Sequence, residues 1–445
     1  MATDAPEITM QDVSGLSRRL REPEWLAAWR ARAFEIYQET PLPIRAQHLW
    51  RYTDPALFEP DDTLLARTVG APVPAAGDEA ASHGVPAEGL TAKESAGPGT
   101  TVVTSGADLK ASGITLTDFT TAARDHEDAL RSLLGRIVGP DTGKFEALNA
   151  AIFREGIYLH IPRGVAVRVP IHLVTRLGDR PLQARRLLVH VEEGASATLI
   201  EEVVGGPESG VGGRSRHYGV TELQLESGSQ LHFVTVQSLS RHTEAHFTQL
   251  ARLLNGASYV PVLASFGGAL TKTNVGATLE GDGSTSEMIG FLSAVGRQRF
   301  DHHTLHHHLG RHTRSNLDYK TVLQDRSRSD YTGLIRIEKE AAFAEAYQEN
   351  RNLLLSERCR ADSIPELEIL TEEVQCKHGA TAGPIDPDHL FYLMSRALPE
   401  AEAVRLIVEG HFEPTLLRLP PELRERLGLL LRSRLESETH KGDGR

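Results

Sequence analysis

The feature that most constrains this fold is a long run of short β-type segments joined by glycine turns. From Gly156 to about Thr381, apolar residues alternate with other residues in short stretches, a period of two that indicates strands. A loose repeat of roughly 30 residues places a glycine and a small residue between these segments. The repeat is clearest at 192–195, 226–229 and 254–257.

No amphipathic helix fits between these turns, so the pattern argues against strand–helix alternation. A right-handed parallel β-helix and a long β-sandwich both satisfy it. The recurrence of glycine at the corners favours the β-helix, because each coil must turn at the same place. We therefore predict a mainly β fold, with a right-handed parallel β-helix core flanked by N-terminal and C-terminal helical regions.

Helical periodicity returns on both sides of the β-rich core and sets the expected domain boundaries. Residues 70–100 contain no aromatic residue and no isoleucine, which is typical of a flexible segment. The expected regions are an N-terminal helical region at 1–69, a flexible Ala-, Gly- and Pro-rich insertion at 70–114, a helical region at 115–155, the β-helix core at 156–384, a C-terminal helical partner-docking region at 385–437 and a disordered tail at 438–445.

Composition and charge narrow the classes of function. The 445 residues carry 60 acidic and 48 basic side chains, a formal net charge of −12, and no basic run with interleaved aromatic residues. This balance opposes binding to a phosphate backbone or to an anionic membrane surface. No apolar stretch reaches about 18 residues, and the first residues lack the pattern of a signal peptide. We therefore expect a cytoplasmic protein that binds neither nucleic acid nor membrane.

Motifs that would identify a common enzyme class do not occur in the sequence. It contains no GxSxG, GxxxxGK[ST] or HExxH motif, and no glycine-rich turn between a strand and a helix. The chain alone therefore lacks a phosphate-binding loop for ATP. Adjacent carboxylates such as Glu201 and Glu202 would face opposite sides of a strand. We expect a protein that is not an enzyme.

The densest cluster of titratable residues is the tract His302–His312. On a strand, His302, Thr304, His306 and His308 would share one face, with successive side chains about 7 Å apart. Such a row could hold a metal ion only with ligands from neighbouring coils. The simpler interpretation is that these histidines are polar side chains that line a surface of the β-helix or stack on its rungs, without a cofactor. A metal-dependent enzyme that uses this tract on a β-scaffold is an alternative function.

Two cysteines occur, Cys359 and Cys376, and both are expected to be free thiols in a reducing compartment. Cys376 and His378 would point to the same side of an extended segment, so a thiolate and an imidazole could together bind iron or zinc. Two ligands do not complete a site, and the spacing also fits a buried cysteine beside a surface histidine. Cys359 lies between two arginines, which suggests a surface thiol with no second ligand.

Five segments of the chain closely resemble the SufB/SufD family, the paired scaffold subunits of the Suf iron–sulfur cluster assembly machine. The matching segments are Tyr331–Ile337, Tyr347–Leu355, Ala361–Ile369, Val374–Thr381 and Leu390–Arg396. Weaker similarity extends over most of the chain, at 22–26, 50–53 and 161–164. The resemblance implies a parallel β-helix core with helical ends, in agreement with the periodicity.

Within the family, the residues resemble the SufD branch. SufB carries a sulfur-accepting cysteine in a segment resembling NCDSLL, where this chain has Arg351, and arginine cannot accept a persulfide. SufB also has a glutamate where this chain has Gly379. Lys377 departs from SufD proteins, which often have a small polar residue there. Its charge could lower the pKa of the Cys376 thiol or disturb the binding of an anionic cluster. A SufB-like homodimeric scaffold is the other alternative, and Arg351 argues against it.

The resemblance also implies partners and ligands. A SufB-like paralogue would pair edge to edge with this chain, and Cys376 and His378 would be metal or cluster ligands at the junction, so that a transient iron–sulfur cluster is shared with SufB. A SufC-like ATPase would dock on the C-terminal helices through Leu390, Phe391 and Met394, although these residues could also cap the β-helix. The isolated chain could form a homodimer. A flavin in the complex is compatible with the family, but no residue pattern here indicates one.

Overall fold

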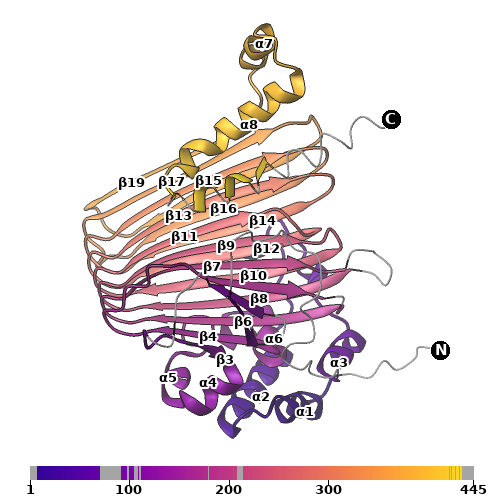
Figure 1. Ribbon diagram of the computed structural model, residues 1–445, viewed down its shortest axis with the longest axis vertical. Helices are drawn as coiled ribbons and strands as arrows, with labels where there is room; N and C mark the ends of the chain where they lie inside the picture. Colours follow the sequence, from indigo (N-terminus) through magenta and orange to yellow (C-terminus); the bar gives the residue numbers. More distant parts are fainter. Residues whose placement is uncertain are drawn as a thin grey trace, which may run out of the picture.

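The computed structural model describes residues 8–70, 92–97, 100–104, 109, 112–178, 180–207, 214–419, 421, 423–425, 427–429 and 431–432. The tail predicted at 438–445 and most of the insertion predicted at 70–114 lie outside these residues. From residue 155 onward the strands wind into a solenoid, which helical segments precede and follow (Figure 1). The prediction of a mainly β, parallel β-helix core with helical ends is confirmed.

Each coil of the solenoid contributes one strand to each of two sheets, and all neighbours from β4 onward pair in parallel. The first sheet contains β4 (Glu155–Ile161), β6 (Leu182–Val191), β8 (Ser215–Leu225), β10 (Thr243–Leu253), β12 (Leu270–Leu279), β14 (Arg299–His308), β16 (Arg328–Ile337) and β18 (Arg360–Ile369). The second contains β5 (Ile171–Leu177), β7 (Ser196–Gly205), β9 (Gln230–Leu239), β11 (Ser258–Ser265), β13 (Thr285–Ala294), β15 (Arg314–Leu323), β17 (Ala344–Leu354) and β19 (Val374–Pro384). Three antiparallel strands extend the sheets at the first coil: β1 (Ala92–Gly97), β2 (Thr100–Thr104) and β3 (Thr115–Asp118).

The corners predicted from the glycine repeat form a column along the solenoid. Gly194, Gly228 and Gly256 have φ angles of 66°, 67° and 63°, left-handed values that residues with a Cβ rarely adopt. Each donates its N–H to a carbonyl of the next coil at 2.8–3.0 Å. In later coils His312 and Phe343 take the same position, and their rings stack with centroids 4.9 Å apart. The left-handed corner is therefore kept even where no glycine supplies it.

Alternate side chains of the two sheets fill the interior of the solenoid. In the first coils this interior is apolar, with Leu159, Leu199 and Phe233 in one buried cluster. Further along the axis, buried polar side chains such as His306 and Gln348 occupy interior positions. The interior thus changes from apolar to partly polar toward the C-terminal coils.

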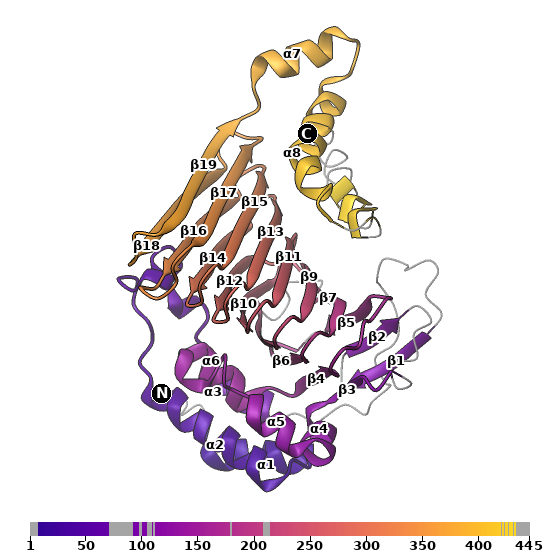
Figure 2. The ribbon, with the colours of Figure 1, turned by 90° about the vertical axis from the view of Figure 1, so that its left-hand side faces the viewer.

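Helices of the N-terminal region pack on the outer face of the sheet that contains β6 and β8 (Figure 2). They are α1 (Met10–Leu20), α2 (Glu24–Glu39), α3 (Asp62–Gly70), α4 (Phe119–Asp125), α5 (Glu127–Leu133) and α6 (Lys144–Ile152), with short 3-10 turns at His48–Trp50, Pro55–Leu57 and Pro140–Thr142. Phe34 and Phe145 from these helices share a buried cluster with Tyr158 and Tyr218 of the strands. The segment at 115–155 begins with strand β3 before its helices.

A buried ion pair joins this helical region to the solenoid. Arg186 on β6 and Glu222 on β8 are fully buried, with Arg186 Nη2 and Glu222 Oε1 2.7 Å apart. The Glu222 carboxylate also accepts the backbone N–H groups of Gly135, Ile137 and Val138, each at 3.1 Å. Arg186 Nη1 donates to Asn149 Oδ1 of α6 at 3.2 Å. These contacts tie the helical segment to two neighbouring strands.

Two helices follow the last strand and differ in their contacts. Helix α8 (Glu400–Leu416) packs on the outer face of the second sheet, where Phe412 contacts Phe291, and Thr415 donates to Asp318 Oδ2 at 2.7 Å. Helix α7 (Pro387–Ser395) has no buried residue and projects beyond the last coil (Figure 2). Among the described helices, none has the length and apolar character needed to span a membrane.

Candidate functional site

The last coil of the solenoid is open. In the described part of the chain, β18 borders only β16, and β19 borders only β17. No residue of β19 is buried, whereas Gln348 and Asn350 on the inner face of the preceding strand are 2% exposed. A strand with a single neighbour presents unpaired backbone N–H and C=O groups along its outer edge. This end of the solenoid can therefore accept a strand from another chain.

Cys376 and His378 lie on β19, at this open end. Cys376 aligns with Ala346 and His378 with Gln348, both of which are buried in the coil beneath. The two residues share one face of β19, with their Cα atoms about 7 Å apart. Cys376 packs against a small apolar cluster that includes Ile337, and His378 is exposed. The structure thus places both predicted ligands on the same face of an unpaired edge.

The protonation of Cys376 is set by its burial. Desolvation raises the pKa of the Cys376 thiol above its usual value, and a hydrogen bond from the Lys377 backbone opposes this rise only in part. The charge of Lys377 therefore does not bring the pKa of the Cys376 thiol below its usual value. Lys377 lies on the opposite face of the strand, aligned with the exposed Tyr347. A metal ion that binds Cys376 must displace a proton from the thiol.

The pair does not form a complete metal site within this chain. Among the described residues, no other His, Cys, Asp or Glu lies close enough to complete a set of three ligands with Cys376 and His378. A structural or catalytic transition-metal site needs at least three protein ligands. Any ion or cluster held at this edge therefore requires donors from another molecule.

The prediction that Cys359 is a surface thiol is wrong. Cys359 is 8% exposed and belongs to a buried cluster with Leu323. Its Sγ donates to the backbone carbonyl of Ser356 at 2.9 Å. The two flanking arginines reach solvent because neighbouring residues at this corner face opposite directions, so their charge does not mark the exposure of the residue between them.

The histidine tract is structural in its contacts. His302, Thr304, His306 and His308 share the inner face of β14, as the period of two predicts, and all four are buried. His306 pairs with Ser286 at 3.0 Å, and His308 bonds to the hydroxyl groups of Thr313 in the following turn and Ser315 on β15. No three side chains of the tract form a metal-ligand set. The predicted alternative that these histidines line a surface is wrong, because all three are buried. The contacts of His306 and His308 match the interpretation that they stack on the rungs, whereas both ring nitrogens of His302 lack a hydrogen-bond partner among the described residues.

Helix α7 carries the three residues predicted to bind the ATPase partner. Phe391 is 74% exposed and Met394 is 43% exposed, while Leu390 is half-buried. The helix makes no buried contact with the solenoid, so these side chains do not cap the β-helix. The helix that covers the outer face of the sheet is α8. An exposed apolar helix surface is typical of a protein-binding site.

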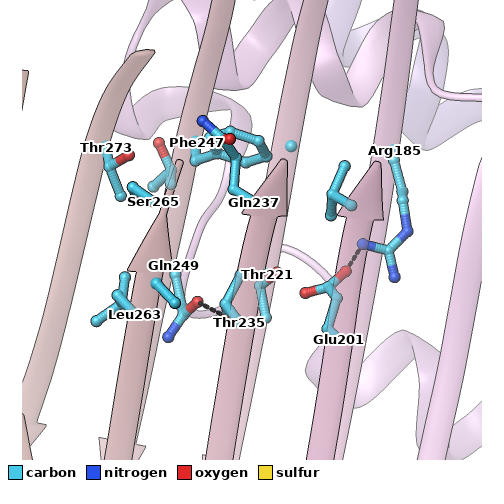
Figure 3. A pocket seen from close by; sticks show the side chains of 14 residues that line it. Arg185, Glu201, Thr221, Thr235, Gln237, Phe247, Gln249, Leu263, Ser265 and Thr273 are labelled. Atoms are coloured by element: carbon cyan, nitrogen blue, oxygen red, sulfur yellow. Dashed lines mark hydrogen bonds and ion pairs between the residues drawn. The ribbon is translucent and has the colours of Figure 1, made fainter. Parts of the chain in front are cut away.

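A small cavity inside the solenoid, lined by both polar and apolar side chains, was not predicted from the sequence. It has a volume of about 30 Å³, enough for one or two water molecules, and strands β6 to β12 line it (Figure 3). Arg185 and Glu201 form a buried ion pair on one side, and Gln249 accepts a hydrogen bond from Thr235 on the other. The only sign of this cavity in the sequence is that a charged residue, Arg185, stands within a mainly apolar strand.

Comparisons with known proteins cover nearly the whole chain. A family model described as "SUF system FeS cluster assembly, SufBD core domain" matches residues 174–411, and "SufBD protein N-terminal region" matches residues 19–173. The iron-sulfur cluster assembly protein SufD of Bacillus subtilis is 26% identical over 423 residues, which cover 93% of this chain and 95% of that protein. SufB of the same organism is 27% identical over 330 residues, covering 74% and 70%. A SufBD family protein of Synechocystis is also 27% identical, over 339 residues.

Proposed function

Because this chain belongs to the SufBD family of iron–sulfur cluster assembly proteins, we propose that it is a SufD-type scaffold subunit. Its partners would be a SufB-like paralogue at the open coil and a SufC-like ATPase at α7. The cargo would be a transient iron–sulfur cluster, held between this chain and the paralogue. The chain would have no turnover of its own, and any flavin would be bound by the assembled complex.

The observation that carries this proposal is the location of Cys376 and His378 on β19, an edge strand that is paired on one side only. A thiolate and an imidazole are ligands that iron accepts, and they stand on one face of β19. Two ligands are too few for a closed site, and the edge beside them offers backbone groups for pairing. Pairing along β19 would bring the ligands of a second chain to the same place.

Two residues and the extent of similarity support the SufD branch over the SufB branch. Arg351 stands where SufB has its sulfur-accepting cysteine, and its guanidinium is exposed and paired with Glu349 at 2.8 Å. Gly379 stands where SufB has a glutamate, and it aligns with Glu349 on β17. The similarity to SufD of Bacillus subtilis spans 93% of the chain, whereas that to SufB spans 74%.

The role that follows from this geometry is positional. The raised pKa of the Cys376 thiol keeps it protonated and poorly nucleophilic in the isolated chain. A cation brought by the paired edge would favour the thiolate, so ligation would depend on assembly. Force from ATP hydrolysis would enter through α7, which follows β19 directly in the chain. Movement of that strand would open or close the shared site.

The proposal is tested by the iron and acid-labile sulfide content of the co-expressed complex, purified without oxygen. Cys376→Ser and His378→Ala should assemble normally and contain less cluster, because neither side chain fills a core position. Cys359→Ser is the matched control and should keep full cluster content. Full content in both ligand variants, or loss in the Cys359 control alone, would show that the ligands lie elsewhere.

A further inference from the structure

A second group of metal-ligating side chains lies at the opposite end of the solenoid from Cys376. His160 on β4 aligns with His190 on β6, and Glu192 follows two residues after His190. One ligand atom from each of the three lies within 4.8 Å of the others. All three side chains are partly exposed on the outer face of the sheet, so an ion from solvent can reach them.

The positions aligned with His160 and His190 form one row across the sheet. In the following strands this row holds Gln224, Arg252, Thr278, His307 and Arg336. Arg252 pairs with Glu280, and Arg336 pairs with Glu338. An arginine beside a carboxylate completes an ion pair and leaves no ligand atom available. Only the first two coils place imidazoles in consecutive positions of this row, with ring centroids 5.3 Å apart and planes inclined by 24°.

In the absence of an ion, two of the three candidate ligands bind each other. His160 Nε2 and Glu192 Oε1 form a hydrogen bond of 3.0 Å, and a metal ion that binds both atoms would replace the proton between them. The other oxygen of Glu192 accepts the backbone N–H of Arg163 at 2.8 Å, which orients the carboxylate. His190 Nε2 faces Glu226 at 3.4 Å, and its buried Nδ1 has no hydrogen-bond partner among the described residues.

Burial also favours the neutral form of His190. Burial, and secondly the neighbouring His160, lower the pKa of His190 below its ordinary value. Two stacked imidazoles repel each other when both carry a proton. The neutral imidazole is the form that ligates a metal, and a carboxylate beside the ring is the usual arrangement that orients such a ligand.

We propose that His160, His190 and Glu192 form a binding site for a divalent transition-metal ion of the Zn²⁺ class. Two imidazole nitrogens and one carboxylate oxygen match the donors that Zn²⁺ prefers, and solvent would supply the fourth ligand. Glu226 would act as a positioning residue through His190. The ion would join β4 to β6 at the first coils of the solenoid, remote from the edge at β19 (Figure 1).

The test uses the full-length chain carrying Cys376→Ser and His378→Ala, so that the proposed cluster ligands cannot contribute. The protein is stripped with a chelator and titrated with Zn²⁺ by calorimetry, and then with Co²⁺, whose visible spectrum reports the number of ligands. One equivalent should bind. His160→Ala and His190→Ala should each weaken that binding by about tenfold or more, because loss of a ligand costs at least as much as loss of a residue that orients one.

His307→Ala is the matched control, because His307 pairs with Glu338 at 2.9 Å in the same row, and its neighbours in that row are Thr278 and Arg336. It should bind Zn²⁺ as tightly as the parent. Bound Zn²⁺ should also raise the melting temperature of the parent and not that of the His160 and His190 variants. Equal Zn²⁺ affinity in the parent, both variants and the control would overturn the proposal, as would the absence of binding by the parent.

Discussion

Removing the Glu222 carboxylate should cost more stability than any exposed ion pair of this protein. Arg186 and Glu222 are both 0% exposed, so a Glu222→Ala variant leaves the Arg186 guanidinium buried without its counter-charge. It also removes the acceptor of three backbone N–H groups, those of Gly135, Ile137 and Val138. Breaking a buried pair from one side costs about 3–5 kcal/mol, and the stranded N–H groups place this case at the upper end of that range.

The matched control is Glu280→Ala, which breaks the pair between Arg252 and Glu280. Those side chains are 44% and 38% exposed, and solvent screens their attraction. The expected loss there is below about 1 kcal/mol. Replacing both partners of the buried pair by apolar residues should not restore stability, because the backbone N–H groups would still lack their acceptor.

The assay combines urea unfolding, followed by circular dichroism, with hydrogen exchange read by mass spectrometry. Glu222→Ala should shift the unfolding midpoint to lower urea and speed exchange in the segment 134–138, while strands β12 to β16 keep their protection. Arg186→Lys keeps the charge but cannot reproduce the planar contacts to Glu222 and Asn149, so its loss should be intermediate. If Glu222→Ala loses no more stability than the Glu280 control, the buried pair does not stabilise the packing of the helical region on the solenoid.

Three further predictions concern pH, partner binding and nucleotide. Burial lowers the pKa of His302 and His306 to about 3 and that of His308 to about 4, whereas a histidine in the unfolded chain has a pKa near 6.5, so below pH 6.5 the unfolded chain binds more protons than the folded one. The free energy of unfolding should therefore be highest above pH 6.5 and should fall toward pH 4 by up to about 1.4 kcal/mol per histidine per pH unit. Urea titrations at several pH values measure this slope, which should be shallower for His302→Phe. Phe391→Glu should abolish capture of the ATPase partner in a pull-down without changing the circular dichroism spectrum. Ile44→Glu, which alters another exposed apolar side chain, should leave capture intact, and capture by the Phe391 variant would place docking elsewhere. The purified chain alone should release no phosphate from ATP, because it has no phosphate-binding loop, and partner-free turnover would contradict this.

Features that repeat along the chain could be predicted from the sequence. The glycines at Gly194, Gly228 and Gly256 mark left-handed corners because residues with a Cβ rarely adopt that conformation, and their spacing indicated the length of a coil. The period of two placed His302 and His306 on one face, and the structure puts that face inside. Local backbone rules were sufficient for both.

Features that depend on which coils become neighbours were harder to predict. His160 aligns with His190 because their strands are neighbours, one coil apart. The repeat was located only from its glycines, and these did not indicate which residues of adjacent strands align. The burial of Cys359 and the raised pKa of Cys376 depend on atoms from other coils. An open edge is likewise a property of the assembled sheet, because nothing within β19 itself records that no strand follows.

The most direct test of the central claim is the identity of the histidine bound to the cluster in the assembled complex. This chain is labelled with ¹⁵N-histidine, combined with unlabelled partners, loaded with iron and sulfide without oxygen, and reduced for pulsed electron paramagnetic resonance. If His378 is a ligand, a ¹⁵N coupling to the cluster should be present, should disappear in His378→Ala and should persist in His160→Ala. A coupling that survives His378→Ala, or no ¹⁵N coupling in the unaltered chain, would contradict the claim that His378 is a ligand at the shared edge.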